Sequence, residues 1–222
     1  MPVRLSAIAR SKGLPHQNQV GFLLGLSSSE ACLVLTYEIK AIQRPRLKAS
    51  TLFLDFKGGF DNVNASTLRD SLLTTHVPSY MVDRGSPFLS ERTCTLVFQG
   101  SPNLLSPVSV GTPQGSPVSP LLFLLYVSPL HISIYRGLMV SYVDDFSITV
   151  VSPSHRGNIR NLQRLFTTIA ARGRAIGVSF SIPKTEPIHW RTPSQKTPPS
   201  RAPLELEAPF FHPSEVVTWL GY

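Results

Sequence analysis

The chain has 222 residues, 42 % of them hydrophobic, so it is long enough to form one domain with a sizeable core. Lys and Arg number 21 against 13 Asp and Glu, and the net charge of +8 favours a polyanion such as nucleic acid as a partner. Two cysteines, Cys32 and Cys94, exclude a disulfide framework and a zinc cluster, and the longest apolar run, residues 121–127, is too short to span a membrane. We therefore expect a soluble intracellular chain without a membrane segment, in which both thiols are buried.

The first predicted elements are a helix and a strand. Residues 27–43 place their apolar side chains on one helical face, and Ser27 with Glu30 has the spacing of a capping box. Residues 51–56 (TLFLDF) are a β-rich apolar run ended by two glycines, which predicts a buried strand.

The middle of the chain mixes helices with a loop. Residues 64–76 predict a helix, and residues 95–98 predict a short strand. Residues 100–117 are rich in Ser, Pro and Gly and predict a loop. A further helix is expected to begin near Pro120, because proline suits the first helical position.

An acidic hairpin is predicted at the centre of the second half. Residues 138–151 form one β-rich stretch interrupted by Asp144 and Asp145, which is typical of two strands joined by an acidic turn. Residues 161–176 predict an amphipathic helix, with Gly177 as its C-terminal cap.

The end of the chain is expected to be irregular. Residues 191–213 are rich in proline and predict an extended loop, and residues 216–220 predict a last short strand. Helices and strands are therefore mixed around a hairpin, which favours an α+β fold with helices on an antiparallel sheet.

Three acidic residues are the candidates for chemistry. Asp55 stands at the end of an apolar strand, where an unpaired charge is costly to bury. Asp144 and Asp145 are adjacent like charges that repel unless a positive partner is near. A hard divalent cation such as Mg²⁺ would satisfy both conditions. Taken singly, each motif is explained as well by an ordinary turn, because Asp tolerates turn backbone.

The order of the motifs changes this balance. Asp55, a glycine-bracketed loop at residues 111–115 and the Asp144–Asp145 pair follow one another as in the palm of reverse transcriptases. The segments that resemble this family are LPHQNQVGFLLGLSSSEACLVL, LFLDFKGGFDNV, GTPQGSPVSP, YVDD, GVSFSIPKTEPIHW and TWLGY. The first of them resembles non-LTR (LINE-type) retrotransposon enzymes in particular. The resemblance covers residues 14–222.

The resemblance implies a reaction and a cofactor. The reaction is the addition of deoxynucleotides to a primer 3′ end on an RNA or DNA template. Two Mg²⁺ ions, for which Mn²⁺ substitutes, clamp the attacking and leaving oxygens in such sites. We expect Asp55 and Asp144 to bridge the two ions and Asp145 to be the weaker partner.

Four further residues take roles from the same resemblance. Phe60 would lie beneath the sugar of the incoming nucleotide and exclude a ribose 2′-OH; the alternative is core packing. Gln114 and Gly115 would contact the template and the nucleotide. Lys184 would donate a proton to the leaving pyrophosphate or pair with phosphate, unless it is only a solvated surface charge.

The resemblance also sets the expected organisation. We expect partial fingers at residues 1–50, the palm at 51–190, the proline-rich loop at 191–213 and a final palm strand at 214–222. We expect the family's upstream basic segment and its thumb to be missing from this chain. Pro87 is expected to break a helix that the family keeps continuous. The chain alone is therefore expected to polymerise poorly.

Other hypotheses remain open from the sequence. One is a retroelement remnant that folds and binds nucleic acid without catalysis, and another is a basic RNA-binding module with a domesticated role. An intron-encoded reverse transcriptase shares the palm motifs. We expect the protein to be nuclear or cytoplasmic, or mitochondrial if it is an intron-encoded enzyme. Protein partners are not predicted.

Overall fold

The computed structural model describes most of the chain, namely residues 2–21, 27–42, 47–74, 76–90, 92–98, 101–113, 115–190, 204–205 and 210–220. The chain forms two compact units. Unit 1 consists of Met1–Gln17, Gly58–Ser128 and Ile176–Val178. Unit 2 consists of Asn18–Lys57, Pro129–Ala175 and Ser179–Tyr222. None of the described helices is long and apolar enough to cross a membrane.

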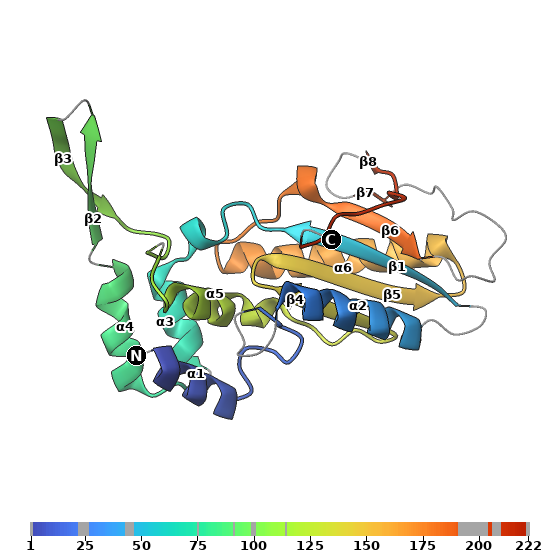
Figure 1. The fold of residues 1–222 in the computed structure, drawn as a ribbon, viewed down its shortest axis with the longest axis horizontal. Coiled ribbons are helices and arrows are strands. Elements are labelled where there is room, and N and C mark those ends of the chain that lie inside the picture. Colours follow the sequence, from blue (N-terminus) through green and yellow to red (C-terminus); the bar gives the residue numbers. More distant parts are fainter. Residues whose placement is uncertain are drawn as a thin grey trace. The chain divides into compact units, whose positions relative to one another are not determined.

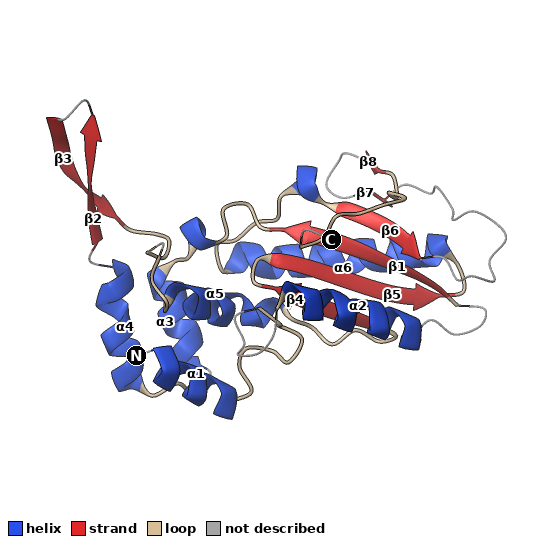
Figure 2. Cartoon of the chain, viewed as in Figure 1, coloured by secondary structure: helices blue, strands red, loops and turns tan. Residues whose placement is uncertain are grey.

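Unit 2 is built on a four-stranded antiparallel sheet in the order β4-β5-β1-β6 (Figures 1 and 2). Its strands are β1 (Lys48–Asp55), β4 (Gly137–Tyr142), β5 (Asp145–Ser152) and β6 (Glu186–Trp190). The central strands β1 and β5 each bury six consecutive residues, because helices cover both faces of the sheet.

The two faces of the sheet have different partners. Helix α6 (His155–Ala175) packs on β1 and β5, and Ser50 of β1 points towards it, because the Ser50 hydroxyl contacts the ring of His155. Helix α2 (Ser28–Ile42) lies on the other side, in a core cluster with Phe53 and Trp219 (Figure 1). Since neighbouring residues of a strand alternate between faces, Asp55 shares the face of Phe53.

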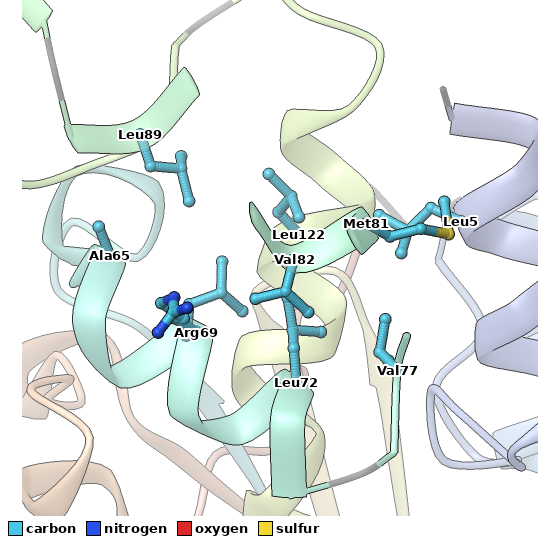
Figure 3. A pocket seen from close by; sticks show the side chains of 10 residues that line it. Leu5, Ala65, Arg69, Leu72, Val77, Met81, Val82, Leu89 and Leu122 are labelled. Atoms are coloured by element: carbon cyan, nitrogen blue, oxygen red, sulfur yellow. The ribbon is translucent and has the colours of Figure 1, made fainter. Parts of the chain in front are cut away.

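Unit 1 is mainly helical. It contains α1 (Pro2–Ser11), α3 (Ala65–Thr74), α4 (Ser79–Ser90), α5 (Ser119–Val127) and a hairpin of β2 (Arg92–Phe98) and β3 (Ser101–Val108). The small pocket in Figure 3 lies among α1, α3, α4 and α5 and is lined almost entirely by apolar side chains. It encloses about 20 Å³, space for about one water molecule, and we therefore interpret it as a packing gap.

Several predictions from the sequence are wrong in detail. Residues 101–108 form strand β3 and not a loop, and α6 begins at His155, six residues before the expected position 161. Helix α4 continues across Pro87, so the predicted break is absent. Residues 216–219 form no strand.

Three further predictions have different outcomes. The mixture of helices with an antiparallel sheet confirms the α+β class. Of the proline-rich stretch 191–213, the structure describes only residues 204–205 and 210–213, which include the short strands β7 (Leu204–Glu205) and β8 (Phe210–Phe211). Cys94 is exposed and Cys32 is partly buried, so neither thiol is the fully buried residue that was expected.

Candidate active site

Two of the predicted carboxylates face each other across neighbouring strands of unit 2. Asp55 is the last residue of β1, Asp145 is the first residue of β5, and the two are direct partners in the antiparallel register. Side chains paired in this way have Cβ atoms about 4.5–5.5 Å apart and lie on the same face of the sheet. Asp144 precedes Asp145 in the turn between β4 and β5. The structure therefore brings together the three acids that the sequence motifs singled out.

The electrostatics of the three acids indicate an unsatisfied negative cluster. Burial, together with the charges of Asp144 and Asp55, raises the pKa of Asp145 to about 6. The pKa of Asp144 is also raised, mainly by burial and further by the charge of Asp55. The three carboxylates thus repel one another at neutral pH, and a cation placed among them would relieve this repulsion.

Lys184 partly offsets this negative charge. It ends the short 3₁₀ helix Ile182–Lys184, and its Nζ lies 2.7 Å from the Asp55 Oδ2. The backbone N–H of Ser181 donates to the Asp55 carbonyl at 2.7 Å, which fixes this segment beside β1. Contact with Asp55 raises the pKa of Lys184, so its ammonium stays charged at neutral pH. Its side chain is 70 % exposed, so this ion pair is open to solvent.

The acidic turn is held by residues that the sequence reasoning did not select. Val143 and Asp144 connect Tyr142 to Asp145, and Val143 has a φ of +57°, which is uncommon for a β-branched residue. The side-chain amide of Gln19 donates to the Val143 carbonyl at 3.1 Å. Gly21 packs so closely that a Cβ there would lie 2.5 Å from the Val143 nitrogen. A strained turn of this kind persists because its surroundings hold it in place.

A buried polar network connects this brace to strand β4. The Ser141 hydroxyl donates to the side-chain oxygen of Gln19 and lies 2.7 Å from the His131 Nε2. Because that hydroxyl is a donor to Gln19, His131 must donate to Ser141 in this arrangement. Residues 18–20 also pair with β4, since the Val20 N–H donates to the Ser141 carbonyl at 2.8 Å. The signal for this network in the sequence is the QVGF segment, which indicates the family and not the brace.

The predicted nucleotide-contacting residues belong to unit 1. Phe60 is partly exposed and stacks on the buried ring of Phe123, with ring centroids 4.4 Å apart. Gly111 is required where it stands, because its φ is +84° and a Cβ would lie 3.0 Å from the Asp61 carbonyl oxygen. Gly115 is exposed and has a φ of +83°, whereas Gln114 lies outside the described residues. Whether Phe60 faces the same cleft as Asp55 stays a prediction.

The donor set fits a hard cation such as Mg²⁺. In the described part of the chain, no three His, Cys, Asp or Glu side chains form a cage that could hold a metal ion by themselves, and this is true of Asp55, Asp144 and Asp145 as well. Magnesium does not need such a cage, because it usually takes one or two carboxylates together with substrate phosphates and water. The buried Oδ2 of Asp55 already forms an ion pair with the Lys184 ammonium. The residue that pairs with Asp55 across the strands, Asp145, supplies a second carboxylate.

Comparison with known proteins gives a consistent result. Residues 3–222 match the family described as reverse transcriptase (RNA-dependent DNA polymerase). The chain is 23 % identical to the probable RNA-directed DNA polymerase from transposon X-element of Drosophila melanogaster, over 89 % of this chain and 22 % of that protein. It is 26 % identical to the corresponding protein from transposon BS of the same fly, over 98 % of this chain and 24 % of that protein. The chain thus spans about a quarter of the length of these relatives.

Solved structures agree on the fold. A structure of apo telomerase from Candida tropicalis, truncated from the C-terminal domain, superposes with a TM-score of 0.61 at 18 % identity, covering 87 % of this chain and 40 % of that one. Telomerase from Candida albicans, solved with a TWJ fragment of telomeric RNA, gives a TM-score of 0.62 at 14 % identity, covering 88 % and 34 %. At this level of identity the likeness concerns the fold alone.

Proposed function

Because the chain belongs to the reverse transcriptase (RNA-dependent DNA polymerase) family, we propose that it is the palm of a retrotransposon polymerase that extends a primer with deoxynucleotides. The observation that carries the proposal is the register pair of Asp55 and Asp145, with Asp144 beside it. The proposed partners are an RNA or DNA template, a primer and deoxynucleoside triphosphates. Two Mg²⁺ ions, when bound, would stabilise the charge that develops on the attacking and leaving oxygens.

The carboxylates of the chain have distinct proposed roles. Asp55 and Asp144 would hold the ions, since Asp55 ends β1 and Asp144 lies in the turn that leads into the neighbouring strand β5. Asp145 has the pKa raised to about 6, so it gives up its proton less readily and suits the weaker role. The braced turn keeps Asp144 in place, which matters because positioning supplies much of the rate in phosphoryl transfer.

Lys184 is proposed to pair with the triphosphate. In the absence of substrate its ammonium rests on Asp55, and the raised pKa keeps it charged. Asp55 would hold a cation in place of the ammonium, and Lys184 would then pair with phosphate oxygens. A lysine that retains its proton favours charge pairing over proton donation to pyrophosphate.

The remaining assignments concern the choice of substrate. Phe60 is proposed as the ring that excludes a ribose 2′-OH, and its stacking on Phe123 would keep the ring in one orientation. Gln114 and Gly115 are proposed to contact the template and the incoming nucleotide. The positive φ of Gly115 lets the backbone adopt a turn that other residues avoid.

Primer extension tests the proposed function. The chain would replace the matching region of the X-element polymerase, and extension of a DNA primer on an RNA template would be measured with Mg²⁺. We expect extension by the fusion protein and its loss in Asp144→Asn, whereas Asp70→Asn, at an exposed position on α3, should extend normally. A fusion that binds primer–template but never extends it would contradict the proposal and favour a remnant that only binds nucleic acid.

A further inference from the structure

Helix α6 carries a row of arginines on its outer face. Arg156, Arg160 and Arg164 follow one another at intervals of four residues and are all exposed. Residues four apart lie on the same side of a helix, and a rise of about 1.5 Å per residue spreads this arginine stripe over about 12 Å. The stripe therefore presents three positive charges along one line.

Among the residues that the structure describes, the stripe has no partner that explains it. Helix α6 contains no Asp or Glu, and in the described residues none of the three guanidinium groups forms an ion pair. Like charges four residues apart repel one another and weaken a helix. The packing of α6 on the sheet uses the opposite side of the helix, through residues such as Leu162 and Phe166. The arginines thus disfavour the fold slightly, unless an anion lies along them.

The stripe and the carboxylates lie on opposite faces of the same sheet. Ser50 and Asn158 are hydrogen-bonded between β1 and α6, which places α6 on the side of the even-numbered β1 residues. Asp55 and its partner Asp145 are on the other side, with the odd-numbered residues. Figure 1 shows α6 and α2 on the two sides of the strands of unit 2. Nucleic acid held at the carboxylates therefore lies on the opposite face of the sheet from the stripe.

We propose that the arginine stripe of α6 is a second nucleic-acid site, which binds the phosphate backbone of a segment distinct from the one at the carboxylates. A strand that advances about 3.4 Å per nucleotide offers three to four phosphates over the length of the stripe. Lys48 begins β1 beside the start of α6, where the Asn158 side chain donates to the Lys48 carbonyl at 2.7 Å, so a further basic residue lies at this end of the helix. Guanidinium groups suit phosphate, because their donors match two phosphate oxygens at once.

Binding of labelled nucleic acid to the chain as it stands tests this proposal. The probe is a single-stranded RNA of about 20 nucleotides, a length that exceeds the stripe several-fold, and its anisotropy is measured over a range of salt concentrations. Arg160→Gln/Arg164→Gln is compared with Lys12→Gln/Lys40→Gln, which removes the same charge from exposed positions on other parts of the chain. A thermal melt checks folding, and the α6 variant should be at least as stable as the wild type because it relieves repulsion.

The expected result follows from counterion release. Loss of two phosphate contacts should make the slope of log K against log salt less negative by about 1.4 and weaken binding about 25-fold at 0.1 M salt. The lysine control should change binding much less. Equal weakening by both variants would overturn the proposal, because it would show that only net charge matters. Asp70→Asn, at an exposed position on α3, should bind the RNA normally. The readout is binding and not extension, so the stripe can be confirmed even if the polymerase proposal fails.

Two further arms identify the ligand. The same sequence as single-stranded DNA and as a DNA duplex distinguishes the source of the phosphates, and a loss in the α6 variant with any of these nucleic acids supports the proposal. Vesicles containing an anionic phospholipid test the alternative that the stripe binds a membrane surface. If the α6 variant loses vesicle binding but retains RNA and DNA binding, the stripe is a membrane surface and the proposal is wrong.

Discussion

The close contact between Gly21 and Val143 predicts a specific defect in Gly21→Ala. A Cβ at Gly21 would lie 2.5 Å from the Val143 nitrogen and 2.6 Å from its Cγ2. Side-chain carbons essentially never come within 3.0 Å of such atoms, so the acidic turn must move by about 0.5–1 Å. Overpacking of this kind costs about 1–3 kcal/mol of folding free energy. A shift of about 1 Å at the carboxylates that we propose as catalytic can lower the rate of extension about 100-fold.

Two assays separate these effects. Urea unfolding of the chain gives the free energy of unfolding, and primer extension by the fusion protein gives the rate. Gly157→Ala is the matched control, because its tightest contact is the rotatable hydroxyl of Ser152 at 2.8 Å and alanine favours a helix. The control should be neutral or stabilising. If Gly21→Ala unfolds and extends primers like the wild type, the proposed brace of the turn does not exist.

Three other residues or pairs give independent predictions. His155 and His189 are buried and stacked, and burial lowers the pKa of each to about 4, so the unfolded chain binds more protons below pH 6.5. Lowering the pH from 7 to 5 should therefore cost about 2 kcal/mol of unfolding free energy for each histidine in urea titrations, and this loss should be absent in His155→Gln/His189→Gln. Phe60→Ala should raise ribonucleotide incorporation by the fusion protein while deoxynucleotide use falls less; an equal response of both substrates would make Phe60 a core residue. Lys184→Ala should strengthen Mn²⁺ binding to the free chain a few-fold, because it removes the cation that rests on Asp55; weaker binding would show that Lys184 does not compete.

The acidic hairpin could be predicted because its signal is local. The β-rich segments on both sides of Asp144 and Asp145 predict two strands, and the structure has them. The capping box of α2 is local as well, and the Ser27 N–H does donate to the Glu30 carboxylate. Strand β3 could not be predicted, because its composition is that of a loop and its structure depends on pairing with β2.

The support of the site could not be predicted, because it joins distant parts of the chain. Gln19 and Val143 are 124 residues apart, and neither residue type marks a turn brace by itself. The turn also begins at Val143 and not at the acids, although a β-branched residue is disfavoured there. Pro87 shows the opposite error, since a strong local rule predicted a break and the helix continues. Local patterns indicated the chemistry, whereas tertiary contacts determine its geometry.

Binding of Mn²⁺ to the chain tests most directly whether Asp55, Asp144 and Asp145 act together as a cation site. The free ion is followed by electron paramagnetic resonance in the presence of a deoxynucleoside triphosphate, because ions of this type take carboxylates and phosphates together. We expect the wild type and Asp70→Asn to bind Mn²⁺ with the same affinity, and Asp55→Asn and Asp144→Asn each to lose most of that binding. Equal binding by all four proteins would contradict the assignment of the three carboxylates as a polymerase site.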